Sequence, residues 1–159
     1  MTNTKSSMSR LHPAHILATW FWTGLSPKAP GTIGSLAALP FGFALMYYGG
    51  QFYLMIGIVA VFVIGTVATH IYCTQTGRTD PGEVVIDEVA GQWIPLLVAG
   101  FNPLYYAIAF ALFRLFDIWK PWPIGWLDQR VKGAFGVMVD DIAAGLAAMG
   151  GLILLQKVI

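Results

Sequence analysis

The charged residues of this chain gather on one side of a series of apolar segments. If these segments cross a bilayer in alternation, all eight Asp and Glu residues and eight of the nine Lys and Arg residues fall on the same side. Only Lys157 falls on the other side. Sixteen charges of mixed sign are more than membrane orientation requires, so this asymmetry predicts a polar working site at one membrane surface.

The composition favours an integral membrane protein over a soluble helical one. Hydrophobic residues make up 57% of the chain and charged residues only 11%, whereas about a quarter of an average soluble domain is charged. The 159 residues leave room for four or five spans and for no separate soluble domain. Acids and bases mix on one side and give a net charge of +1, which argues against a nucleic-acid surface. We therefore expect no nucleic-acid partner, and no obligatory protein partner is predicted.

We predict an all-α fold, a polytopic integral membrane helical bundle of four or five spans with an N-terminal interfacial helix. Residues 52–72 contain no Lys, Arg, Asp or Glu and form the clearest span. The other apolar runs cover residues 36–48, 84–99, 104–119 and 137–156. Turns are expected at residues 49–51 and 101–103, and loops at residues 26–35, 73–83 and 121–136. Several runs are short, so four spans with a re-entrant helix pair is the alternative to five.

The two ends of this arrangement are expected to differ. Residues 1–10 are polar and are predicted to form a disordered cytoplasmic tail, while residues 11–159 form a single membrane-embedded domain. Residues 12–24 mix His and Trp with small residues, which is typical of a short helix at the level of the lipid headgroups. The six Trp residues are interpreted mostly as an interfacial belt. Cys73 is the sole cysteine, which excludes an intramolecular disulfide and a multi-cysteine metal site.

Acidic residues are the strongest candidates for chemistry, because they stand at span ends amid apolar neighbours. Many carboxylates at one place repel one another without cations, and oxygen-only clusters suit a hard ion such as Mg²⁺. Three groups are expected to converge at the charged surface: Glu83 with Asp87 and Glu88, then Asp117, and finally Asp140 with Asp141.

Glu83 lies four residues before Asp87 and shares its side if the helix begins early enough. For Asp80 and Asp128 we prefer the simpler interpretation of a solvated rim of helix ends.

Two cationic residues can bind an anion at the same surface. Arg114 stands three residues before Asp117 on one predicted helix, and its guanidinium can grip a phosphate through two parallel hydrogen bonds. The alternative is an ion pair between Arg114 and Asp117 within the helix. Lys120 can supply a point charge. Arg78 and Arg130 are explained by membrane orientation alone.

The segment Gly31-Thr32-Ile33-Gly34-Ser35 offers a further anion site. It provides free backbone N–H groups and the hydroxyls of Thr32 and Ser35 at a helix start, a geometry that binds anions. It is not a Walker A loop, because no Lys follows the second Gly. A plain turn with a Ser cap has the same composition.

Four segments of the chain resemble the bacterial phosphatidylglycerophosphatase A family. They are GLSPKAPGTIGSL from Gly24, DPGEVVIDEVAGQW from Asp80, FRLFDIWKPWPI from Phe113 and GVMVDDIAAG from Gly136. The similarity thus covers essentially the whole chain after Ser9. Lys28 and Glu83 fall outside the family pattern, and Ala134 stands where that pattern has a second glycine.

The resemblance implies a membrane-embedded, magnesium-dependent phosphatase domain. Its substrate is expected to be phosphatidylglycerophosphate, which loses its terminal phosphate to give phosphatidylglycerol in phospholipid biosynthesis. The expected location is the bacterial cytoplasmic (inner) membrane, multi-pass, with the active site facing the cytoplasm. The family's acidic motif falls on Asp87 and Glu88, its Arg/Asp/Lys motif on Arg114, Asp117 and Lys120, and its double acid on Asp140 and Asp141.

These residues suggest roles in phosphate-ester hydrolysis, which needs charge neutralisation and a positioned nucleophile. The acids are the catalytic and Mg²⁺-binding candidates, with Asp117 and Asp140 or Asp141 as the main ligands. Thr32, Ser35, Arg114 and Lys120 are the phosphate-binding candidates. The nucleophile is either a metal-activated water or an aspartate that forms an aspartyl-phosphate. A transporter and a non-catalytic membrane scaffold are the rival functions, although the predicted spans carry no charges at mid-length.

Overall fold

The computed structural model describes residues 8–158, so most of the predicted N-terminal tail lies outside the described residues. These residues form an all-α bundle, as predicted, with six α-helices and one short 3-10 helix. The elements are α1 (Pro13–Ala18), η1 (Thr23–Leu25), α2 (Pro30–Thr76), α3 (Ile86–Ala99), α4 (Pro103–Trp119), α5 (Ile124–Arg130) and α6 (Gly133–Gln156).

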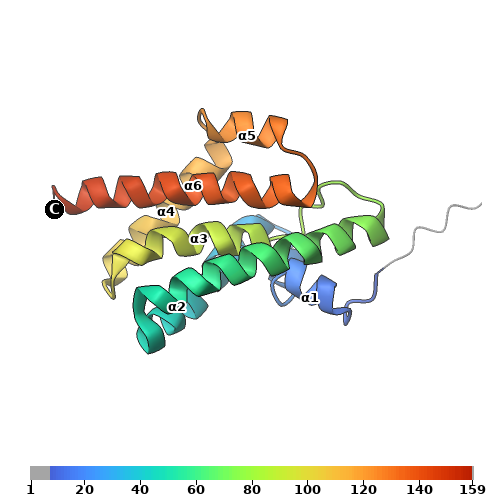
Figure 1. The fold of residues 1–159 in the computed structure, drawn as a ribbon, viewed down its shortest axis with the longest axis horizontal. Helices are drawn as coiled ribbons and strands as arrows, with labels where there is room; N and C mark the ends of the chain where they lie inside the picture. The colour runs from blue at the N-terminus through green and yellow to red at the C-terminus, as the bar shows by residue number, and fades with distance from the viewer. Residues whose placement is uncertain (1–7, 159) are drawn as a thin grey trace, which may run out of the picture.

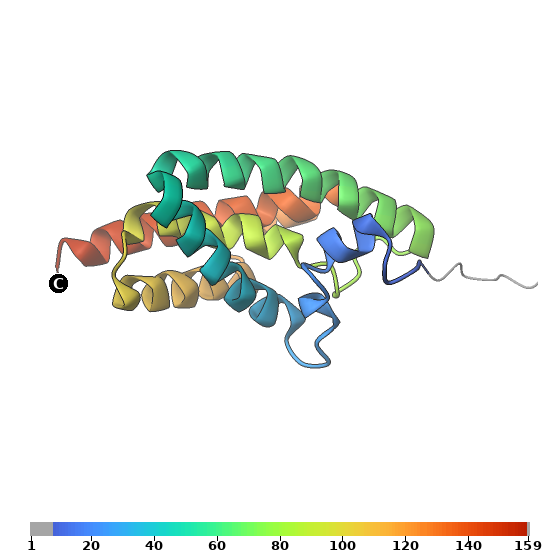
Figure 2. The ribbon, with the colours of Figure 1, turned by 90° about the horizontal axis from the view of Figure 1, so that it is seen from below.

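Helix α2 is two arms joined at Gly50. This residue has φ 63° and ψ −160°, a conformation that glycine adopts without steric cost. The chain reverses there. The first arm leads away from the end of the bundle where α1 lies, and the second arm returns to it (Figures 1 and 2). The turn predicted at residues 49–51 is therefore confirmed. The first arm begins at Pro30, which places Gly31 to Ser35 inside the helix rather than in the predicted loop.

Helix α3 lies at the centre of the bundle. It packs most extensively against α6 and also against both arms of α2 (Figure 1). The indole of Trp93 donates a hydrogen bond to the carbonyl of Ala38 in the first arm, at 2.8 Å. A Cβ on Gly57 in the second arm would lie 3.3 Å from the same ring. Trp93 and Trp20 are buried, so these two tryptophans do not belong to an interfacial belt.

Two helices, α2 and α6, are long and apolar enough to cross a membrane. Val59, Val63 and Val67 stand four residues apart on the second arm of α2, and more than half of each side chain is exposed. Such an apolar stripe matches a lipid-facing surface. Helix α3, with 14 residues, is about 21 Å long, which is shorter than the hydrocarbon core of about 30 Å.

The loops also differ from the prediction in two places. The interfacial segment of residues 12–24 is α-helical only from Pro13 to Ala18, where His12 caps the helix by accepting a hydrogen bond from the Ala14 N–H, and the 3-10 helix η1 follows at Thr23. The loop predicted at residues 121–136 contains α5, and α6 begins at Gly133 rather than near Val137. The second change places more helix at the charged end of the molecule.

Candidate active site

A cavity of about 880 Å³ opens at the charged end of the bundle. Its walls come from the end of α2, the loop at residues 77–84, the start of α3, the end of α4, α5 and the start of α6. The acidic candidates Asp87, Glu88, Asp117, Asp140 and Asp141 all line it, as does Lys120. Residues that are up to 54 positions apart in the sequence are thus brought to one place, as the convergence argument predicted.

Three of these carboxylates form a tight group. Asp87, Glu88 and Asp141 each place a carboxylate oxygen within 4.8 Å of the other two. One oxygen of each, Asp87 Oδ1, Glu88 Oε2 and Asp141 Oδ2, is buried without a hydrogen-bond partner among the described residues. Buried, unpartnered carboxylates are costly unless a cation neutralises them. The donor set consists of oxygen alone and fits a hard divalent ion such as Mg²⁺.

The spacing of this acidic triad is set by glycines one helical turn away. Gly91 follows Asp87 by four residues on α3, and Gly145 follows Asp141 by four residues on α6. A Cβ on Gly145 would lie 2.3 Å from the Gly91 carbonyl oxygen, and a Cβ on Gly91 would lie 2.5 Å from the Asp141 carbonyl oxygen. The two backbones therefore touch at a point where any larger side chain would push the helices apart.

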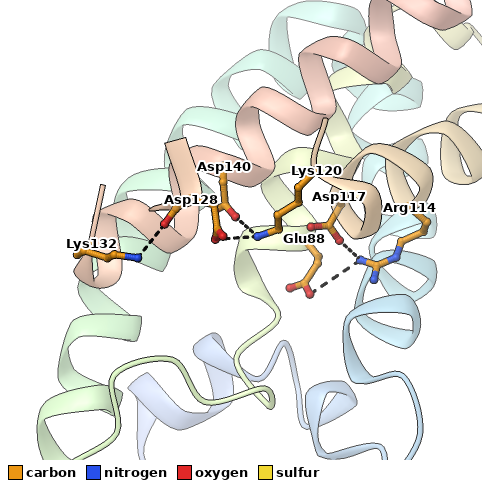
Figure 3. A network of polar contacts seen from close by, with 7 residues as sticks. All are labelled: Glu88, Arg114, Asp117, Lys120, Asp128, Lys132 and Asp140. Atoms are coloured by element: carbon orange, nitrogen blue, oxygen red, sulfur yellow. Dashed lines mark hydrogen bonds and ion pairs between the residues drawn. The ribbon is translucent and has the colours of Figure 1, made fainter. Parts of the chain in front are cut away.

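Arg114 joins three helices beside the triad. Its Nη1 lies 2.6 Å from Asp117 Oδ2, 3.9 Å from Glu88 Oε1 and 3.3 Å from Ser35 Oγ (Figure 3). The ion pair with Asp117 that we considered as an alternative is thus present, and Glu88 is a second acidic partner. Glu88 and Asp117 line the cavity, whereas Arg114 and Ser35 do not. A phosphate grip by Arg114 stays a prediction.

Lys120 lies inside the cavity between two carboxylates. Its ammonium pairs with Asp140 and lies 2.9 Å from Asp128 Oδ1 (Figure 3). Burial opposes the charge on Lys120, but the hydrogen bonds that its ammonium donates to Asp140 and Asp128 outweigh this effect and raise its pKa above the usual value. The same contact with Lys120 lowers the pKa of Asp128. Lys120 therefore carries a fixed positive charge over a wide pH range.

Asp128 is exposed, which agrees with its interpretation as part of a solvated rim, and its carboxylate also forms an ion pair with Lys120. Helix α5, which was not predicted, places Asp128 near the end of α4. Glu83 does not share a helical face with Asp87, because α3 begins only at Ile86. Glu83 instead pairs with Arg78 and accepts a hydrogen bond from the Tyr72 hydroxyl at 3.0 Å.

The hydroxyl candidates lie apart from the cavity. Ser35 is buried and donates its hydrogen bond to the Gly31 carbonyl oxygen, while accepting one from Arg114. Thr32 is partly exposed on the first turns of α2 and is not among the residues lining the cavity. Phosphate binding by Thr32 and Ser35 stays a prediction that the geometry of the cavity does not favour.

The fold and this cavity define an all-helical protein with two candidate membrane spans, an acidic site suited to a divalent cation and a fixed cation beside it. A sequence model described as PgpA, phosphatidylglycerophosphatase A, matches residues 16–156. The chain belongs to the phosphatidylglycerophosphatase A family.

Known relatives agree with this placement. Phosphatidylglycerophosphatase A of Escherichia coli (strain K12) is 41% identical over 92% of this chain and 85% of its own length. The protein of the same name from Haemophilus influenzae is 36% identical over 92% of this chain and 91% of its own length. A putative phosphatidylinositol-3-phosphatase of Bacteroides thetaiotaomicron is 36% identical over 82% of this chain and 86% of its own length. No solved structure matches the chain.

Proposed function

We infer that the chain is a phosphatidylglycerophosphatase, a phosphoric monoester hydrolase that converts phosphatidylglycerophosphate to phosphatidylglycerol in phospholipid biosynthesis. The family match over most of the chain and two relatives of that name support this function. In the reaction, water is added across the terminal phosphate ester, which releases inorganic phosphate and leaves the headgroup glycerol with a free hydroxyl. The phosphodiester that joins this glycerol to the diacylglycerol is unchanged.

We propose that the acidic triad of Asp87, Glu88 and Asp141 holds Mg²⁺. The observation that carries this proposal is the set of three buried, unpartnered carboxylate oxygens in one group. Bound there, a divalent cation would neutralise charge that develops on the transferring phosphoryl group. Asp117 and Asp140 differ from Asp87 and Asp141 because each is already paired with a cation, Arg114 or Lys120. Glu88 also contacts Arg114, at 3.9 Å, but through the oxygen Oε1, which leaves Oε2 without a partner.

The cationic residues then have separate roles. Lys120 lines the cavity and binds phosphoryl oxygens as a point charge, with Asp140 and Asp128 fixing its position. Arg114 holds Glu88 and Asp117 in place from outside the cavity, which limits the freedom of the triad. Both roles supply preorganised electrostatics rather than covalent chemistry.

We propose that the protein lies in the bacterial cytoplasmic membrane with the cavity facing the cytoplasm. The two arms of α2 together with α3, α4 and α6 would give five crossings. The gathering of Lys and Arg at the cavity end supports this orientation through the positive-inside rule. The C-terminus lies at the opposite end of the bundle (Figure 1).

A phosphate-release assay on purified, detergent-solubilised protein tests the function. We expect Mg²⁺-dependent release from phosphatidylglycerophosphate that a chelator abolishes and added Mg²⁺ restores. Phosphatidylinositol 3-phosphate, suggested by the Bacteroides relative, serves as the comparison substrate. A higher kcat/KM for the inositol lipid would overturn the assigned substrate. An absence of phosphate release from both lipids would favour the scaffold or transporter alternative.

A further inference from the structure

The cavity is lined by one cationic side chain, Lys132, that has no role in the chemistry proposed at the triad. Lys132 lies in the short connection between α5 and α6 and lines the cavity. Its Nζ donates a hydrogen bond to the backbone carbonyl oxygen of Asp128 at 3.1 Å. Among the described residues Lys132 has no carboxylate partner, whereas the other two cavity cations, Lys120 and Arg78, are both ion-paired.

The position of Lys132 separates it from the proposed phosphoryl site. In Figure 3, Lys132 lies on the side of Asp128 that faces away from Lys120. Arg114 lies at the opposite end of the labelled side chains. Lys132 is exposed, whereas Asp140 and Asp141 are buried. The cavity therefore has an inner region with the acidic triad and Lys120, and an outer wall that carries an available positive charge.

The substrate has a second anionic group that fits this arrangement. Phosphatidylglycerophosphate carries a terminal phosphomonoester and, one glycerol unit away, the phosphodiester of the lipid. When the monoester occupies the inner region, the phosphodiester must lie nearer the mouth of the cavity. A phosphodiester has one delocalised negative charge, and an ammonium without a carboxylate partner offers it a full positive charge.

We propose that Lys132 binds the phosphodiester of the lipid headgroup and thereby contributes to substrate specificity. This assignment rests on the proposed function. The hydrogen bond to the Asp128 carbonyl holds the ammonium beside the cavity without neutralising its charge. Since the Asp128 carboxylate also holds Lys120, one residue positions the cations for both phosphates.

The experiment compares Lys132→Ala and Lys132→Arg with wild type and with Arg130→Ala. Arg130 is a matched control, because it is an exposed cation two residues away that stacks on Trp126 and does not line the cavity. Phosphatidylglycerophosphate hydrolysis is measured in mixed micelles at fixed detergent-to-lipid ratio. We expect Lys132→Ala to raise KM about three- to tenfold with kcat nearly unchanged, and Lys132→Arg to retain most of the affinity.

A second readout separates the two phosphates. Inorganic phosphate resembles the monoester alone, so its inhibition constant should be the same in wild type and Lys132→Ala. An unchanged KM in Lys132→Ala, an equal rise in Arg130→Ala, or an equal weakening of phosphate inhibition would each overturn the proposal. A wild-type protein that does not hydrolyse the lipid would instead contradict the proposed function, which makes the two failures distinguishable.

Discussion

Glu88 Oε1 occupies the space where a side chain on Gly31 would begin. A Cβ on Gly31 would lie 2.2 Å from this oxygen and 3.3 Å from Arg114 Nη1. The start of α2 and the acidic end of α3 therefore meet so closely that any side chain at residue 31 would force the Glu88 carboxylate to move. This contact links residues 31–35 to the site, although they lie in a helix and do not line the cavity.

Gly31→Ala should therefore damage the site without a change in any charged group. The added methyl must displace Glu88 and the guanidinium beside it, and a displacement of about 1 Å can lower catalysis up to 100-fold. We expect kcat to fall at least about tenfold. Gly150→Ala is the control, since no atom lies within 4 Å of a Cβ there. Retention of full activity by Gly31→Ala would mean that kcat does not depend on the exact position of the Glu88 carboxylate.

Asp141→Asn should abolish Mg²⁺-dependent activity at almost constant side-chain volume. The change removes one of the three carboxylates of the triad, and we expect metal affinity to fall on the order of 100-fold or more. Calorimetric titration of the purified protein with Mg²⁺ measures this directly. Asp80→Asn removes a charge from the same cavity outside the triad and should leave both affinity and activity near wild type.

Arg114→Lys should reduce activity strongly, by about 10- to 100-fold. The single Nη1 atom of Arg114 contacts Asp117, Glu88 and Ser35, and the shorter lysine side chain cannot bring its ammonium to the same point. If Arg114 acts by positioning these acids, the Mg²⁺ concentration needed for half-maximal activity should rise as well. If it grips the substrate phosphate instead, KM for the lipid should rise while the metal dependence stays unchanged. Arg130→Lys is the control.

Cys73 reports the membrane orientation, because it is the sole cysteine and lines the cavity. A membrane-impermeant maleimide should label it in inverted vesicles and spare it in intact spheroplasts. A Lys157→Cys, Cys73→Ser variant should give the opposite pattern. Labelling after detergent treatment controls for partial burial of the thiol. Labelling of Cys73 in intact spheroplasts would place the cavity outside the cytoplasm.

The sequence predicts the helices and their turns well, because these depend on local chemistry. Residues 49–51 and 101–103 combine breakers with an end to the apolar pattern, and the chain turns at both. Helix α4 begins where Asn102 can accept a hydrogen bond from the Leu104 N–H and Pro103 can occupy the first position. Helix α5 was missed because prolines and glycines flank a run of only seven residues.

The pairing of charges could not be predicted in the same way. Which acid meets which base depends on how each helix rotates about its axis, and that rotation is decided by close contacts such as Gly31 with Glu88. The sequence therefore indicated five acids, with Asp117 and Asp140 or Asp141 as the main ligands, but not their partners. The structure brings Asp87, Glu88 and Asp141 together as a triad, in which only Glu88 has a cationic partner, and places Asp117 and Asp140 in ion pairs with Arg114 and Lys120.

The contact between Gly91 and Gly145 has a consequence for how this protein can change over time. The spacing between Asp87 and Asp141 is fixed by backbone atoms that touch one turn deeper in the bundle, not by the side chains that face outward. Substitutions on the lipid-facing surface can therefore accumulate without altering the distance between the two charges. The outer face can change to suit membranes of different thickness or fluidity, while the spacing of the two carboxylates stays the same.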